Sequence, residues 1–427
     1  MLDIKIIREN PDRVKAALKT RNADYDSYID EILEIDEKRR KLSTETDALK
    51  AEQNKVSKQI PIMKKNGENT DAVMAEMKEI SEKIKNDNAV ISELETKQRD
   101  TLLRIPNIPS ETTPIGKDDS ENVENEKFGE PVVPDFEVPH HVDIMARFDG
   151  IDKDAAGRVA GMGFYYLLGD IARLHEAVLA YARDFMIDEK HFTYVIPPFM
   201  MHGDVVKGVM SFPEMDAMMY KIEGEDLYLI GTSEHSMIGK FIDQIIPEEE
   251  LPYTLTSYSP CFRKEKGAHG IEERGVYRIH QFEKQEMIVI CKPEDSMMWF
   301  DKLWQNTVDL FRSLDIPVRT LECCSGDLAD LKVKSCDVEA WSPRQKKYFE
   351  VGSCSNLGDA QARRLKIRVK GKDGSKYFAH TLNNTVVAPP RMLIAFLENN
   401  LNADGSINVP AALRPYVGGK EKLIPVK

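Results

Sequence analysis

The chain has 427 residues, a formal net charge of −13 and 31% charged residues, so two or three domains with a buried core are expected. Any contact with nucleic acid has to come from local basic patches, because the overall negative field repels phosphate. No apolar run reaches the ~18 residues of a membrane span, and charges begin at Asp3, which argues against a signal peptide. We therefore expect a soluble cytoplasmic protein with no membrane contact.

Six cysteines occur without a CxxC pair or a regular framework: Cys261, Cys291, Cys323, Cys324, Cys336 and Cys354. This usage predicts free thiols in a reducing compartment. The adjacent Cys323 and Cys324 are compatible with a metal site, but no histidine lies at ligand spacing, so we expect no structural zinc.

Heptad spacing marks two long helices, over residues 27–60 and 73–105. Apolar side chains recur every seven residues in the first, at Tyr28, Ile35, Leu42, Leu49 and Val56. The segment between the helices, residues 61–71, contains Pro61 and Gly67 and is expected to form a turn. The pattern predicts an antiparallel coiled-coil hairpin within a first domain of residues 1–105.

The distal part of the hairpin is basic, although the hairpin as a whole is not. Between residues 50 and 65 a single acid, Glu52, is set against five lysines: Lys50, Lys55, Lys58, Lys64 and Lys65. A solvated helix face and a surface that contacts nucleic-acid phosphates are both compatible with this charge pattern.

Residues 106–140 contain six prolines and many acids, which predicts a linker with little regular structure. Residues 141–427 are expected to be globular, with a helix over 170–187 and strand-like alternation in several later runs: 226–234, 254–265, 276–290, 331–341 and 347–354. Strands joined mostly by hairpin-length turns, with helices grouped elsewhere, predict an α+β fold built on a largely antiparallel sheet.

The segment CFRKEKGAHGIEERGVYRIHQFEKQEM, residues 261–287, predicts two strands around a glycine-containing loop. Period-two alternation puts Cys261, Arg263 and Glu265 on one face of the first strand. On the second strand it groups Arg278, His280, Phe282, Lys284 and Glu286, with Tyr277, Ile279 and Met287 on the core side. Arginine forks suit phosphate oxygens and phenylalanine suits a stacked heterocycle. The pattern favours a nucleotide site; a surface sheet with salt-bridged charges is the alternative.

Three further segments carry polar side chains that would complete such a site. Thr232 and Glu234 are expected on one face at the end of a strand, where they would receive an ammonium group. Glu350 and Ser353 form a hard-oxygen pair suited to magnesium. Arg391 follows two prolines at the start of a helical run, whose first N–H groups favour anions.

Taken in order, these segments resemble class II aminoacyl-tRNA synthetases, specifically the seryl-tRNA synthetase family, over nearly the whole chain. The opening MLDIKIIRENPDRVKAALKTR and the helical hairpin look like the family's N-terminal arm. The helix of residues 170–187 and the strand that ends in VIPPF resemble motif 1, SPCFRKEKG…RGVYRIHQFEKQEM resembles motif 2, and NNTVVAPPRMLIAFLEN resembles motif 3. GTSEH and FEVGSCSN are similar to its Thr-x-Glu loop and its metal and ATP segment. Motif 3 departs from the class pattern at Ala388, Pro389 and Pro390, where glycines are usual.

The resemblance implies a tRNA-binding arm (1–105), a linker (106–140) and a catalytic domain (141–427) with an antiparallel sheet flanked by helices. It implies ATP-dependent activation of L-serine to seryl-adenylate and transfer to tRNA(Ser) and tRNA(Sec), with release of AMP and pyrophosphate. Magnesium would be the cofactor, and motif 1 would form the interface of a homodimer.

The resemblance also implies roles for single residues. The ATP-binding set would be Arg263, Lys264, Glu265, Arg278, Ile279, Phe282, Glu350, Val351, Gly352, Ser353 and Arg391. Within it Arg263, Glu350 and Arg391 would be catalytic, and Glu350 and Ser353 would hold magnesium. The serine-binding set would be Thr232, Ser233, Glu234, Arg263, Glu286 and Thr385. The five lysines of residues 50–65 would contact tRNA, and residues 266–275 of the motif 2 loop receive no assigned role.

Two alternative functions can be distinguished by the long helical arm and by the charged face of residues 261–287. A related ligase that loads an amino acid onto a carrier protein would share the catalytic core but lack the long arm. A structural coiled-coil protein with an inactive globular module would have no reason to keep Arg263, Phe282 and Glu286 aligned.

Overall fold

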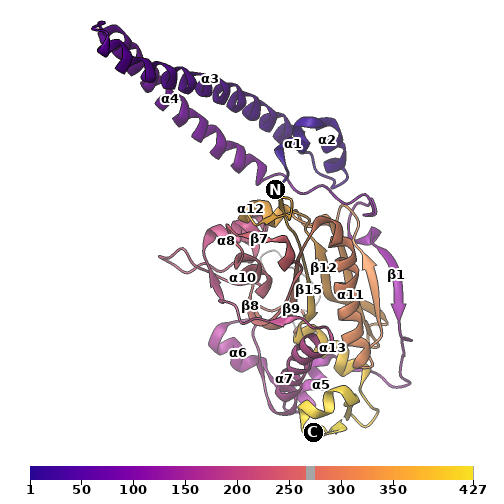
Figure 1. Cartoon of the computed structure of the whole chain (residues 1–427). Helices are drawn as coiled ribbons and strands as arrows, with labels where there is room; N and C mark the ends of the chain where they lie inside the picture. The colour runs from indigo at the N-terminus through magenta and orange to yellow at the C-terminus, as the bar shows by residue number, and fades with distance from the viewer. Residues whose placement is uncertain (266–274, 427) are drawn as a thin grey trace. The chain divides into compact units, whose positions relative to one another are not determined.

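The computed structural model describes residues 1–265 and 275–426 (Figure 1). The chain divides into two compact units, Met1–Pro106 and Asn107–Lys427. Within the described residues, no helix has the length and apolar character needed to cross a membrane.

The first unit is entirely helical. Its elements are α1 (Ile4–Glu9), α2 (Pro11–Lys19), α3 (Asp26–Lys65) and α4 (Asp71–Leu102). Helices α3 and α4 pack along each other and confirm the predicted hairpin. The predicted end of the first helix at residue 60 is wrong, because α3 continues through Pro61 to Lys65. The N–H of Asn66 closes this last turn by donating to the carbonyl of Ile62 at 3.0 Å.

One buried carboxylate joins the helices at the base of the hairpin. Asp36 of α3 accepts hydrogen bonds from Arg8 of α1 (2.8 Å), from Arg40 of its own helix (2.9 Å) and from Gln98 of α4 (3.2 Å). Burial alone would raise the pKa of Asp36, but these donors hold it below its ordinary value. A polar residue is therefore stable at the helix interface, because its charge is matched by arginines.

The second unit is built on an eight-stranded sheet, in the order β1-β10-β11-β12-β15-β9-β8-β4. The strands are β1 (Val123–Phe128), β4 (Thr193–Tyr194), β8 (Tyr253–Phe262), β9 (Gln281–Cys291), β10 (Val318–Glu322), β11 (Lys334–Ser342), β12 (Lys347–Asn356) and β15 (His380–Val387). Neighbouring strands are antiparallel except β4 and β8. The predicted α+β fold with a largely antiparallel sheet is confirmed.

Residues 107–140 are part of the second unit, and the expectation of a linker with little regular structure is wrong for β1. This strand pairs with β10 at the edge of the sheet, from Val123 opposite Glu322 to Phe128 opposite Val318. The prolines do not prevent pairing, because none lies between residues 115 and 130. Asn107 fastens the start of the segment by donating to the carbonyls of Leu331 and Leu357 at 3.1 and 3.0 Å.

Helices cover the two faces of the sheet differently. The larger core lies between one face and α7 (Gly169–Asp184), α11 (Ser296–Ser313) and α13 (Pro389–Asn399). On the other face, α10 (Ser233–Gly239) and α12 (Ala360–Leu365) cover only part of the strands, over a smaller core that includes Ile288 and Ile290 of β9. The rest of that face is available for a site.

Shorter elements complete the unit. The helices are α5 (His141–Arg147), α6 (Lys153–Ala160), α8 (Gly203–Val209) and α9 (Phe212–Met218), and the strands are β2 (Ile151–Asp152), β3 (Tyr166–Leu167), β5 (Met200–Met201), β6 (Tyr228–Leu229), β7 (Ile245–Pro247), β13 (Arg368–Lys370), β14 (Lys376–Phe378), β16 (Ile407–Asn408) and β17 (Lys422–Leu423).

Candidate active site

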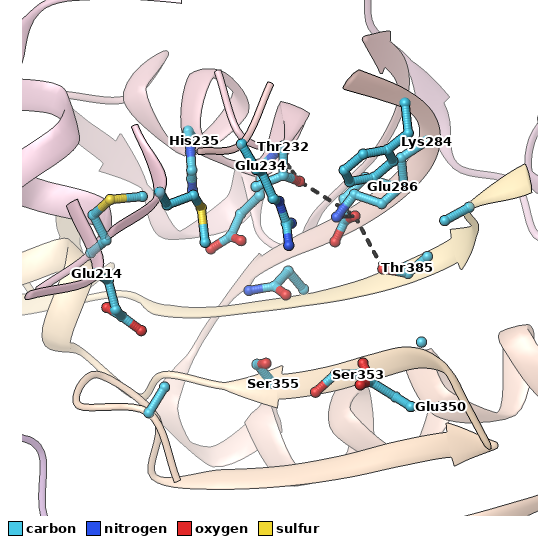
Figure 2. Close-up of a pocket in the computed structure, with 18 of the residues that line it drawn as sticks. Glu214, Thr232, Glu234, His235, Lys284, Glu286, Glu350, Ser353, Ser355 and Thr385 are labelled. Atoms are coloured by element: carbon cyan, nitrogen blue, oxygen red, sulfur yellow. Dashed lines mark hydrogen bonds and ion pairs between the residues drawn. The ribbon is translucent and has the colours of Figure 1, made fainter. Parts of the chain in front are cut away.

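A cavity of about 460 Å³ lies over β8, β9, β12 and β15 on the partly covered face of the sheet. This volume is in the range of pockets that hold small molecules and cofactors. Its lining is rich in charged and hydroxyl side chains from segments far apart in the sequence, as Figure 2 shows.

Strand β9 delivers its side chains to the cavity by simple alternation. Ile288 and Ile290 lie under α10 and α12, and the same face continues through Glu286, Lys284 and Phe282 into the cavity. One face of a single strand thus changes from apolar to charged at the point where helical cover ends. The predicted shared face of Phe282, Lys284 and Glu286 is confirmed.

The alternation predicted for residues 276–280 is wrong. Strand β9 begins only at Gln281, and Tyr277, Arg278 and Ile279 all line the cavity in succession. His280, placed on the charged face by the sequence, bonds instead with the carbonyl of Arg263 through its Nδ1 at 3.0 Å. Without regular sheet pairing there is no reason for side chains to keep a period of two.

Arg263 and Glu265 follow the end of β8 and also reach the cavity. The Nε of Arg263 donates to the carbonyl of Gly231 at 3.1 Å, and its guanidinium lies 5.3 Å from the ring centre of Phe282. Glu265 forms an ion pair with Arg278 at 3.3 Å. The two arginines and the aromatic ring that suggested a nucleotide site therefore line one cavity. The motif 2 loop of residues 266–275 lies outside the described residues except for Gly275.

Thr232 and Glu234 line the cavity, but the prediction that both lie on a strand face is wrong. Strand β6 ends at Leu229, and Thr232 is the N-cap of α10, where its hydroxyl accepts from the N–H of Glu234 at 3.4 Å. The N-cap preference for threonine explains why the chain turns into a helix here. Ser233 is buried and, like Lys264, is not among the side chains that line the cavity.

Two carboxylates share one end of the cavity and differ in their partners. Glu286 is buried, forms an ion pair with Lys284, and accepts from the hydroxyls of Thr232 and Thr385 at 3.5 Å each (Figure 2). Glu234 accepts from the Nε2 of Gln361 at 2.8 Å. Desolvation, together with the nearby charge of Glu286, raises the pKa of Glu234 to about 7. This end of the cavity would therefore gain from an added cation.

A β-bulge brings Glu350 and Ser353 to the same cavity. Residues three apart in a regular strand point to opposite faces, but β12 carries one extra residue: Gly352 pairs with Val338 and Glu350 with Glu339, so Val351 is the insertion. All four residues from Glu350 to Ser353 line the cavity. The bulge therefore explains why Glu350 and Ser353 line the same cavity, although they lie three residues apart in a strand.

Arg391 closes this side of the cavity from the first turn of α13. Its guanidinium forms an ion pair with Glu350 at 3.0 Å and lies 4.3 Å from the ring centre of Tyr277. The charge of Arg391 holds the pKa of Glu350 below its ordinary value, although burial opposes the shift. The glutamate is therefore an anion that can bind a cation.

The donor set suits magnesium bound together with phosphates. In residues 1–265 and 275–426, no group of three or more His, Cys, Asp or Glu is arranged to hold a metal by itself. Magnesium needs no such cage, because it commonly binds through one or two carboxylates, water and substrate phosphates. Glu350, with Ser353 on the same wall, fits that requirement.

Several residues that line or support the cavity were not assigned by the sequence: Tyr277, Lys284, Lys332, Gln361 and Asn383. Strand alternation identified the position of Lys284 but gave it no role, and it placed Tyr277 on the core side. Lys332 comes from the loop before β11 and Gln361 from α12, and no local pattern marks either residue.

Comparisons with known proteins agree with this arrangement. Residues 1–109 match the family model of the seryl-tRNA synthetase N-terminal domain, and residues 219–400 match the tRNA synthetase class II core domain (G, H, P, S and T). The chain is 41% identical to the serine–tRNA ligase of Methanocella arvoryzae over 99% of this chain and 100% of that protein. It is 42% identical to that of Thermococcus onnurineus, over 99% and 97% of the two chains.

Solved structures show the same fold. The crystal structure of seryl-tRNA synthetase from Pyrococcus horikoshii complexed with ATP matches with a TM-score of 0.94 at 38% identity, over 100% of both chains. The cytoplasmic serine–tRNA ligase from Naegleria fowleri in complex with AMP matches with a TM-score of 0.89 at 33% identity, over 100% of this chain and 99% of that one. Identity of this extent along the full length, with both halves of the chain matched, means that the chain belongs to the seryl-tRNA synthetase family.

Proposed function

We propose that this protein activates L-serine with ATP to form seryl-adenylate and then transfers the seryl group to tRNA(Ser). The observation that carries the proposal is one cavity with a nucleotide-type half, built around Arg263, Phe282 and Arg391, and an ammonium-type half, built around Glu234 and Glu286. ATP and an amino acid have to meet in such an arrangement for the amino acid to be activated.

The nucleotide half would hold ATP by stacking and by fixed cations. Phe282 would stack on the adenine, and Glu265 would accept from its amino group. Arg263 would bind the α-phosphate, since its guanidinium lies against the Phe282 ring and so close to where the base would end. Arg278 and Arg391 would bind the outer phosphates. In the structure Arg278 pairs with Glu265 and Arg391 with Glu350.

The amino-acid half would recognise serine by charge and hydrogen bonding. Glu234 and the hydroxyl of Thr232 would receive the ammonium group, and Thr385 with Glu286 would receive the serine hydroxyl. Alanine has no hydroxyl to hydrogen-bond with Thr385 and Glu286, so it would forgo the contacts that favour serine in this part of the cavity.

Catalysis of the first step would rest on charge stabilisation. The serine carboxylate attacks the α-phosphorus of ATP, a bond forms to the carboxylate oxygen, and pyrophosphate leaves with the electrons of the broken phosphoanhydride bond. Arg263, held by its bond to the Gly231 carbonyl, would face the negative charge that builds up on the α-phosphate. A magnesium ion at Glu350 and Ser353 would supply further positive charge for the phosphates. No protein nucleophile is required.

In the second step a hydroxyl of the terminal tRNA ribose, by family likeness the 3′-hydroxyl, attacks the seryl carbonyl, and AMP leaves. We propose that the hairpin of α3 and α4 binds tRNA, with Lys50, Lys55, Lys58, Lys64 and Lys65 on phosphates. We propose tRNA(Sec) as a second acceptor, and a purified tRNA(Sec) transcript that accepts no serine would refute this extension.

We further propose a cytoplasmic homodimer. The second unit exposes large apolar side chains at Ile196 (77% exposed), within the motif 1 resemblance, and at Val159 (72%) and Met162 (78%), in the segment that precedes it in the sequence. Such side chains gain from cover by a second copy. Light scattering at micromolar concentration would show twice the chain mass of 48.6 kDa, and a monomer would contradict the proposal.

Exchange of labelled pyrophosphate into ATP tests the first step directly. The purified protein with magnesium should exchange label when L-serine is added, and at least about a hundredfold more slowly with alanine. Exchange that does not depend on the amino acid, or that favours alanine, would contradict the proposed serine site.

A further inference from the structure

Lys332 is a cation that lines the cavity and has no role in the proposed binding of ATP and serine. It lies in the loop between β10 and β11, and its side chain lines the cavity together with Ser353. Its Nζ donates to the hydroxyl of Ser353 at 3.2 Å and to that of Ser335 at 3.1 Å. An ammonium group therefore stands on the same wall as the Ser353 side chain proposed to hold magnesium.

The backbone around Lys332 is fixed on both sides. The N–H of Lys332 donates to the carbonyl of Ala329 at 3.0 Å, and the N–H of Val333 donates to the carbonyl of Asn356 at 2.8 Å. The carbonyl of Leu331 accepts from the Nδ2 of Asn107 at 3.1 Å. The loop thus presents Lys332 from an anchored position, so the ordering cost on ligand binding falls mainly on its side chain.

Lys334, two residues later, forms an ion pair with Glu322, donates to Thr112 at 3.1 Å and does not line the cavity, whereas Lys332 does line it. The hydrogen bonds of Lys332 to Ser335 and Ser353 have neutral hydroxyl acceptors, and its charge also acts on the carboxylates of Glu350 and Asp337. Exchange of a hydroxyl for a phosphate oxygen would give the ammonium a charge-assisted hydrogen bond, about twice as strong as a neutral one.

The contact of Lys332 with Ser353 indicates that it would reach the outer phosphates of the nucleotide and not its base. Under the proposed function, the base lies on Phe282 and the α-phosphate on Arg263, whereas Ser353 and Arg391 lie toward the outer phosphates. A cation bonded to Ser353 at 3.2 Å is placed for those outer phosphates. A lysine suits this place, since it is a compact point charge on a flexible stem that can follow a mobile triphosphate end.

We propose that Lys332 binds the β- and γ-phosphates of ATP beside Ser353, as a cation additional to Arg278, Arg391 and magnesium. This inference rests on the proposed function. It assigns a positioning role: Lys332 holds the group that leaves as pyrophosphate and reduces the dependence of ATP binding on magnesium. A purely structural lysine would stabilise the fold without distinguishing ATP from AMP.

Calorimetric titration of ATP and of AMP in EDTA-containing buffer tests the proposal on the full chain. Lys332→Met should weaken ATP binding about tenfold and change AMP binding by less than twofold, because only ATP has outer phosphates. Lys332→Gln keeps a hydrogen-bond donor for the two serine hydroxyls but has no charge, so it shows the effect of losing the charge alone. If the methionine variant does not fold, the glutamine variant replaces it in the test. Lys347→Ala, an exposed lysine at the start of β12, is the matched control and should bind both nucleotides normally.

The results distinguish a wrong role for Lys332 from a wrong proposed function. Equal losses for ATP and AMP, or no loss in either folded variant, would overturn the role of Lys332. Wild-type protein that binds AMP but not ATP without magnesium would overturn it as well. Wild-type protein that binds neither nucleotide, with or without magnesium, would instead overturn the proposed function. Pyrophosphate exchange provides a second readout: Lys332→Met should need several times more magnesium for half-maximal rate.

Discussion

The helical hairpin and the sheet unit hold their structures in different ways. In the hairpin, residues 47–69 and 71–97 have no buried side chain, and burial is concentrated at the base around Ile32 and Asp36. In the sheet unit, charged groups such as Lys284 and Glu286 are themselves buried, and each is matched by a partner from the same cavity.

A substitution should therefore have different consequences in the two regions. Side chains of the outer hairpin face solvent over long stretches, so changing their charge should alter binding to a partner and leave the fold intact. Side chains of the cavity depend on one another, so a single change there affects ligand binding, neighbouring charges and local stability together. The two regions should therefore separate the second step of the proposed reaction from the first.

The largest effect should come from Arg263→Ala. Loss of a fixed cation at the α-phosphate is expected to reduce serine-dependent pyrophosphate exchange about a hundredfold or more, while circular dichroism stays normal. Arg158→Ala, at an exposed position of α6, is the matched control. Near-normal exchange in the Arg263 variant would remove the arginine from the mechanism.

Replacement of the five lysines of residues 50–65 by glutamine should act only on the second step. The KM for tRNA is expected to rise at least tenfold, and charging should lose part of its salt dependence, because phosphate contacts displace counterions. Serine-dependent pyrophosphate exchange should stay normal. The matched control replaces five exposed lysines of the second unit: Lys346, Lys347, Lys370, Lys372 and Lys376. If the two quintuple variants charge tRNA equally well, the arm lysines do not bind it.

The KM for serine should fall as the pH rises from 6 to 8. Glu234 has a pKa of about 7, above its ordinary value of 4.5; only its ionised form attracts the ammonium group of serine. Roughly one molecule in ten is ionised at pH 6 and nine in ten at pH 8, so the KM should change about tenfold across this range. Glu234→Gln should raise the KM and remove the pH dependence. An unchanged profile in this variant would assign the titration to another group.

The smallest effect should come from Gln361→Leu. Gln361 is buried and donates to Glu234 at 2.8 Å; loss of that donor would raise the pKa of the carboxylate further. The KM for serine at pH 7 is expected to rise severalfold, with its pH midpoint moved upward and the KM for ATP unchanged. A change in both KM values would instead indicate a general distortion of the cavity.

Sequence patterns predicted the regular parts of this molecule well. Heptads predicted the hairpin, and period-two alternation placed Phe282, Lys284 and Glu286 together, because each pattern follows from the geometry of one repeating backbone conformation. The patterns predicted less well where the backbone is not regular. Residues 276–280 precede β9, and Thr232 begins a helix instead of ending a strand.

Other features depend on contacts between distant segments, which no local pattern records. The bulge at Val351 is visible only from the pairing of β12 with β11. Lys332 lines the cavity from a loop, and Gln361 donates to the cavity residue Glu234 from a short helix; both lie far from Glu234 along the chain. Residues 107–140 read as a linker because their composition is rich in proline and acid, yet β1 gains its partner from β10, nearly two hundred residues later.

Attachment of labelled serine to unfractionated tRNA, by the purified protein with ATP and magnesium, tests both steps of the proposed reaction in one experiment. We expect serine to be attached, no other amino acid to be attached at a comparable rate, and Arg263→Ala to slow the reaction about a hundredfold or more. Failure of the wild-type protein to charge any tRNA, in a preparation that a known serine–tRNA ligase does charge, would contradict the proposed transfer of serine to tRNA.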